Sequence, residues 1–84
     1  MKSEHRKTLE RVFRKPAPTD IPWAAVQSML VAAGVSVRER SDSRMTLVMN
    51  GELMVLQRPH PKPLAVAATV RDIASFLSTA GVSP

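Results

Sequence analysis

Two histidines, His5 and His60, are the side chains of this sequence best suited to acid or base chemistry near neutral pH, because an unperturbed imidazole has a pKa of about 6.5. His60 stands in the string RPHPKP between Arg58 and Lys62, whose positive charges could hold a phosphate beside the ring. This arrangement could carry acid–base chemistry at a phosphate, which needs a group that takes up a proton, a group that returns one to the leaving oxygen, and positive charge for the phosphate. A structural role for His60, with its ring hydrogen-bonded to loop backbone, is the favoured alternative. His5 lies in a charged segment and is interpreted as a solvated residue.

Further basic side chains are expected around the edge of a small sheet and its loops, where acidic residues are sparse. The residues expected to contact RNA are Arg38, Arg40, Arg58 and Lys62, with Gln57 beside them and Arg71 approaching from the last helix. Such contacts go largely to phosphates and therefore weaken as salt is added. Scattered solubilising charge is the alternative interpretation.

The composition predicts one small domain, spanning residues 1–84, with an anionic partner. The chain has 84 residues, and its 12 Lys and Arg against 7 Asp and Glu give a net charge of +5. Nucleic acid, an acidic protein and a membrane surface are all compatible with this charge. The absence of cysteine excludes disulfides and cysteine-based zinc sites. No apolar run approaches the roughly 20 residues of a membrane span, and the charged N-terminus lacks the apolar stretch of a secretory signal, so we expect a cytoplasmic protein.

Hydrophobic spacing predicts three helices. A short one over residues 3–14 carries a narrow apolar stripe and is followed by a proline-containing linker over residues 15–20. A second helix is expected over residues 21–33, with Asp20 as its cap and Gly34 after its end. Trp23 is in phase with the apolar stripe of this helix, so we interpret it as a core residue and not as a base-stacking platform. The third helix is expected over residues 66–80.

Three strands are expected between the second and third helices, over residues 35–40, 44–49 and 53–57. Asn50-Gly51 predicts a type I′ hairpin between the last two, because that turn needs positive φ at both central residues. Met45, Leu47 and Met49 share one face of their strand. The next strand places Leu53, Val55 and Gln57 either on that face or on the opposite one, depending on register.

The order of elements predicts an α+β fold, in which a three-stranded antiparallel sheet carries helices on one face. After the first helix, the order α-β-β-β-α is that of double-stranded-RNA-binding domains. Fold analogy alone does not establish function.

Four strings, taken in order, resemble the HicA family over residues 21–84: IPWAAVQSMLVAAGVSV, SRMTLVMNG, RPHPKP and VRDIASFLSTAGV. The most specific part is RPHP followed by a helix that ends in AGV. The resemblance implies a fold of the double-stranded-RNA-binding type. It also implies a toxin that binds and cleaves messenger RNA with no metal or other cofactor, and a HicB-like antitoxin protein that covers the active face.

Two positions depart from the family pattern. Members usually carry a catalytic His at the start of the second strand, where this chain has Arg44, and some carry a His where this chain has Gln57. A guanidinium stays protonated near neutral pH, so Arg44 cannot act as a base. It could clamp a phosphate or stabilise the transition state, or it could be a solvated charge at a strand end. If cleavage occurs, we expect His60 to be the acid or base, with the phosphate held by Arg44, Arg58 and Lys62.

Three hypotheses therefore stand at the level of sequence. The first is a HicA-like endoribonuclease toxin that is held inactive by its antitoxin. The second is a module of the same fold that binds RNA or an antitoxin without cleavage, which the missing His favours. The third is a purely structural interaction domain, which only the composition supports.

Overall fold

The computed structural model describes residues 1–40, 43–58 and 64–84, and in these ranges the predicted α+β architecture is confirmed. The elements follow one another in the expected order: α1 (Ser3–Val12), α2 (Trp23–Ala32), β1 (Ser36–Glu39), β2 (Arg44–Met49), β3 (Glu52–Gln57) and α3 (Ala67–Thr79). The strands form one antiparallel sheet with β2 in the middle. After α1, the order is thus α-β-β-β-α, as predicted.

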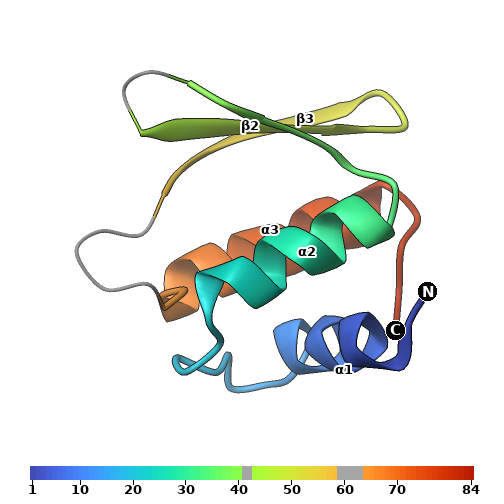
Figure 1. Ribbon diagram of the computed structural model, residues 1–84, viewed down its shortest axis with the longest axis vertical. Coiled ribbons are helices and arrows are strands. Elements are labelled where there is room, and N and C mark those ends of the chain that lie inside the picture. Colours follow the sequence, from blue (N-terminus) through green and yellow to red (C-terminus); the bar gives the residue numbers. More distant parts are fainter. Residues whose placement is uncertain (41–42, 59–63) are drawn as a thin grey trace.

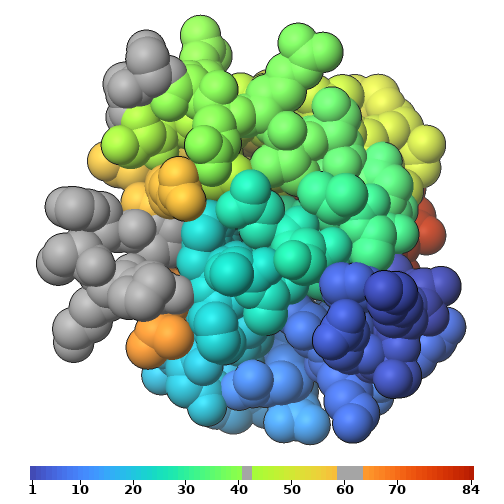
Figure 2. Space-filling view, viewed as in Figure 1, coloured from blue at the N-terminus to red at the C-terminus, as the bar shows by residue number. Residues whose placement is uncertain are grey.

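The molecule is built in three layers (Figure 1). The sheet is the first layer, α2 and α3 cover one of its faces, with α2 against β1 and α3 against β3, and α1 lies on the far side of these two helices. Figure 2 shows α1, in blue, directly against α2, in teal. Leu9 and Val12 of α1 are buried, so the N-terminal helix shares the common core and is not an appendage to residues 21–84.

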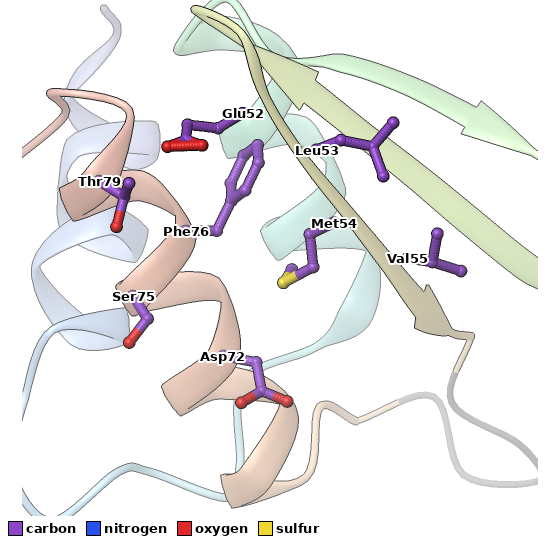
Figure 3. Close-up of a pocket in the computed structure, with 8 residues that line it drawn as sticks. All are labelled: Glu52, Leu53, Met54, Val55, Asp72, Ser75, Phe76 and Thr79. Atoms are coloured by element: carbon purple, nitrogen blue, oxygen red, sulfur yellow. The ribbon is translucent and has the colours of Figure 1, made fainter.

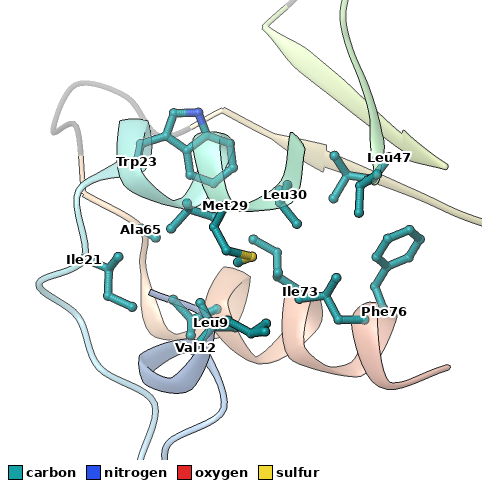
Figure 4. Packing of buried hydrophobic residues seen from close by; sticks show 14 of the residues in the cluster. Leu9, Val12, Ile21, Trp23, Met29, Leu30, Leu47, Ala65, Ile73 and Phe76 are labelled. Carbon is teal, nitrogen blue, oxygen red and sulfur yellow. The ribbon is translucent and has the colours of Figure 1, made fainter. Parts of the chain in front are cut away.

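The apolar residues whose spacing predicted the helices are packed together in the core (Figure 4). Trp23 is buried, which confirms its interpretation as a core residue. Its indole Nε1 has no hydrogen-bond partner among the described residues. Besides Leu9 and Val12 of α1, the other buried members of the core come from α2, the sheet, α3 and the segments that flank them: Ile21, Val26, Met29, Leu30, Val35, Met45, Leu47, Ala65, Val70, Ile73, Phe76 and Leu77.

The start of α2 differs from the prediction. Asp20 does not cap the helix; it forms an ion pair with Arg11 of α1, and the N-cap is Pro22, with no side-chain cap. Residues 21–22 are extended because they pair with the segment before α3: the Ala65 N–H donates to the Ile21 carbonyl (3.0 Å). Helix α2 therefore begins at Trp23, two residues later than expected.

Helices α2 and α3 both end in the sequence Ala-Gly-Val, and their ends have the same conformation. Gly34 and Gly81 have φ values of +95° and +92°, a conformation that glycine adopts without a steric penalty. After each glycine a valine N–H donates back into the last turn, from Val35 to Leu30 (3.0 Å) and from Val82 to Leu77 (2.8 Å). This is the Schellman arrangement, which satisfies carbonyls that the helix end would leave unpaired.

The register of the sheet decides which side chains face the helices. Residues Met45 and Leu47 of β2 pair with Leu56 and Met54 of β3, and these alternate side chains face the core. The remaining β3 side chains, Leu53, Val55 and Gln57, therefore lie on the opposite, outer face, which settles the alternative left open by the sequence.

The hairpin between β2 and β3 has the predicted two-residue turn. Asn50 and Gly51 have φ values of +49° and +81°, as a type I′ turn requires. The Asn50 side chain also crosses to the C-terminal end of α3, where its Nδ2 donates to the Ala80 carbonyl (2.7 Å). A turn residue thereby fixes the hairpin to the helix layer.

We expect substitutions of Asn50 to separate these two roles. Asn50→Gly keeps the turn conformation and removes the hydrogen bond to Ala80, so it should lower the free energy of unfolding by about 1 kcal/mol. Asn50→Ala loses the same hydrogen bond and also the polar side chain that lets Asn adopt the left-handed region, so it should be less stable than Asn50→Gly by up to about 1 kcal/mol. Urea unfolding measures both. Equal stability of Asn50→Gly and the parent chain would show that the hydrogen bond contributes nothing.

Candidate nucleic-acid interface

Three chain segments meet at the end of the sheet opposite the hairpin turn. The Arg40 N–H donates to the Arg44 carbonyl (2.7 Å), and the Arg58 N–H donates to the Ser43 carbonyl (2.9 Å). These backbone bonds extend the two ladders beyond the strands. They place Arg40, Arg44 and Arg58 at one end of the sheet. The sequence predicted that Arg38, Arg40, Arg58 and Lys62 gather around the sheet edge, and of these Arg40 and Arg58 line the hollow found here.

The gathered side chains line a small hollow of about 120 Å³. Its described lining residues are Glu39, Arg40, Ser43, Arg44, Met45 and Arg58. Three guanidinium groups around one depression suit a doubly charged anion such as a phosphate, because each can donate two parallel hydrogen bonds to oxygen. The hollow is thus a candidate anion site in the described part of the chain.

The outer face of the sheet continues this basic region. Arg38 pairs with Thr46, and Arg44 pairs with Gln57, in register positions that alternate with the buried residues Met45 and Leu47. Arg38, Arg44 and Gln57 are therefore on the face that α2 and α3 leave uncovered. They are exposed, so a nucleic acid lying on this face would reach them.

One member of the hollow was missed by the sequence reasoning. Glu39 accepts from the Arg58 guanidinium, with Nη1 and Oε1 3.0 Å apart. The strand alternation that places Val37 inward also places Glu39 inward, two residues later, and this was the available signal. Its carboxylate reduces the positive charge of the hollow and holds Arg58 in place. It is also the one carboxylate among the described lining residues that could accept a proton.

Arg71 does not lie in this hollow, contrary to the prediction that it approaches the same region. It lines a separate groove between α3 and the segment after α1, together with Arg14 and Lys15. The reason is helix phase: the sheet-facing side of α3 near β3 presents Asp72, so its neighbour in sequence faces toward α1.

The two histidines have different outcomes. His60 and Lys62 lie outside the described residues, so their proposed roles stay predictions. The interpretation of His5 as solvated is wrong: its side chain is only 20% exposed and lies beside α2, where it lines a hollow with Ala24 and Ser28. Its Nε2 is 3.9 Å from a Glu4 carboxylate oxygen. The packing of α1 against α2 covers most of this ring, and the sequence of α1 alone did not show that.

Residues 1–40, 43–58 and 64–84 contain no cluster of three or more His, Cys, Asp or Glu side chains that could hold a metal ion. None of their helices is long and apolar enough to cross a membrane.

Comparison of the chain with models of protein families, with curated proteins and with solved structures finds no match. The α+β fold is thus established by the structure itself, and no relative assigns a function to the basic end of the sheet.

We expect the Glu39–Arg58 pair to matter little for stability. Both side chains are about half exposed, at 48% and 49%, and such pairs contribute at most about 1 kcal/mol. Glu39→Gln should therefore change the free energy of urea unfolding by less than about 1 kcal/mol. A larger loss would mean that this pair, and not the backbone ladder, holds the ends of β1 and β3 together.

Proposed function

We propose that the chain is a HicA-like toxin that binds messenger RNA at the basic end of its sheet. The observation that carries the proposal is the convergence of Arg40, Arg44 and Arg58 on one hollow, with Arg38 on the adjoining outer face. Arginines arranged in this way favour RNA phosphates over a small neutral ligand. The net charge of +5 supports the same class of partner.

Messenger RNA as the target, and cleavage as the activity, rest on the family resemblance of residues 21–84. In this proposal Arg44 and Arg58 hold the scissile phosphate and His60 is the acid or base. Arg44 takes the position of the usual histidine and stays protonated, so its role is electrostatic. A HicB-like antitoxin would inhibit the toxin by covering the same basic surface with acidic side chains.

A second candidate is a module of the same fold that binds RNA or the antitoxin without cleaving. The specific observation in its favour is the make-up of the hollow: among its described residues, the one group able to accept a proton is Glu39, and that carboxylate is already paired with Arg58. The Arg58 guanidinium thus already engages the Glu39 carboxylate, and the described lining of the hollow contains no imidazole.

Binding should be tested first with Arg40→Ala and Arg44→Ala. Each removes a contact to phosphate, so each should weaken binding to a labelled RNA hairpin about equally for different RNA sequences. Each should also lower the slope of log affinity against log salt by about 1. Arg6→Ala is the matched control, because this exposed arginine lies on α1, across the molecule from the sheet. Fluorescence anisotropy over a salt series measures these effects.

Equal losses in Arg6→Ala and Arg44→Ala would show that binding follows net charge and not the hollow. Arg71→Ala adds a second comparison. A loss confined to that variant would move the RNA site to the groove between α1 and α3.

Cleavage is tested by incubating the chain with messenger RNA at low salt in the presence of a chelator. If the first candidate is right, the parent chain cleaves, chelation changes nothing, and His60→Ala abolishes turnover. If the second is right, the parent chain is inactive and Arg44→His gains activity, because an imidazole restores a base at the start of β2. Unchanged cleavage by His60→Ala would remove His60 from the mechanism.

A further inference from the structure

The edge formed by β3 is unusual for a small sheet because no described segment covers it and no charged residue lies between its two ends. Natural proteins protect edge strands by keeping them short, by placing charges on them or by covering them. The other edge strand, β1, follows this rule with four residues that include Arg38 and Glu39. Strand β3 has six residues, and all four between its terminal Glu52 and Gln57 are apolar.

The backbone of β3 is open for pairing at alternate residues. The bond from the Arg58 N–H to the Ser43 carbonyl shows that Arg58 points its backbone groups toward β2. By the antiparallel alternation, the same holds for Glu52, Met54 and Leu56. The N–H and C=O groups of Leu53, Val55 and Gln57 therefore point outward, and none of the backbone bonds between described segments reaches them.

A groove runs along this edge, between β3 and α3 (Figure 3). Met54 and Phe76 point into it from the strand and the helix, while Leu53 and Val55 lie on the far side of the strand from α3. The exposed fractions of Leu53 and Val55 are 65% and 49%, which is high for apolar strand residues. The edge thus offers outward backbone groups between an apolar outer surface and a groove of mixed lining, in which Met54 and Phe76 are the apolar residues that strand addition could cover.

We infer that β3 pairs with β3 of a second copy of this chain, antiparallel and centred on Val55. In this register Val55 opposes Val55, and Leu53 opposes Gln57, so all the outward backbone groups meet as hydrogen-bonded pairs. The result is a continuous six-stranded sheet across a two-fold axis. Such an interface is isologous, because each strand supplies the same surface to the other.

The side chains of β3 are complementary to themselves in this register. On the inner face, Met54 opposes Leu56, which brings apolar side chains of the second copy to the groove beside Phe76. Glu52 opposes Arg58 at both ends of the pairing, so opposite charges meet twice. These are non-hydrogen-bonded pairs, where side chains approach most closely. A shift of the pairing by two residues along the strand would lose both charge pairs, so this register is the favoured one.

The dimer does not depend on the proposed function, because it uses the β3 edge and needs no RNA. An interface of a few residue rows is small, so association should be weak and concentration-dependent.

The test is sedimentation equilibrium of the whole chain without nucleic acid, from micromolar to millimolar concentration. Val55→Lys places two like charges against each other at the two-fold axis and should raise the dimer dissociation constant at least about tenfold. Val48→Lys is the matched control: Val48 is also an exposed valine of the outer face, at 38%, but it lies on the central strand. It should leave the dissociation constant within about twofold of the parent value.

The register is tested by exchanging charges. Glu52→Arg and Arg58→Glu should each be monomeric, because like charges then meet at both ends of the pairing. Mixed in equal amounts, the two variants should form a heterodimer. At one end of that heterodimer the introduced arginine meets the introduced glutamate, and at the other end the native Arg58 of one variant meets the native Glu52 of the other. Circular dichroism of each variant confirms that it is folded, and the recovered association of the mixture shows it directly.

Three results would overturn the inference. A parent chain that sediments as a monomer up to millimolar concentration means that the edge is not a self-association site. Equal disruption by Val48→Lys and Val55→Lys means that sheet faces stack and strand edges do not pair. Failure of the charge-exchanged mixture to associate, when each variant is folded, means that the strands pair in another register.

Discussion

The packing of Met45 and Leu47 against the helix layer is the contact on which the rest of the structure depends. Both side chains stand on the central strand and are fully buried, so β2 can take only one orientation over α2 and α3. A slip of one residue would turn these side chains to solvent and bury Arg44 and Thr46 instead. The burial of two side chains thereby fixes the faces of all three strands.

The basic end of the sheet follows from that constraint. Once Met45 faces the helices, Arg44 must face outward, and the paired Gln57 and the neighbouring Arg38 must do the same. The alternation of side chains along β1 places Glu39 on the same side of the sheet as Val37. This brings Glu39 toward Arg58 across the end of the sheet. A surface for phosphates and a restraining carboxylate are therefore produced by the same alternation that builds the core. The charged side chains of this site stay in contact with water, so forming the site costs little free energy of desolvation.

Both ends of the sheet are held by backbone chemistry that needs few special residues. At one end, Asn50 forms the turn and joins the hairpin to the last carbonyls of α3. At the other, the ladders continue past the strands through Arg40 and Arg58. The two long edges differ more strongly: β1 is short and charged, whereas β3 is long and apolar. This asymmetry gives the small fold a free surface for association in addition to its basic face.

The sequence by itself determined the secondary structure, the hairpin turn and the helix ends, because these depend on local rules: hydrophobic period, positive φ at Asn50 and Gly51, and glycines after two helices. It also placed Arg40 and Arg58 around one edge of the sheet, since consecutive antiparallel strands bring their ends together. Only the tertiary structure decided the partial covering of His5 by α2, the pairing of Asp20 with Arg11, the position of Arg71 beside α1, and the outward face of Val55 on an open edge. Each of these depends on how separate elements pack, and the periodicity of one element carries no information about which neighbour will lie against it.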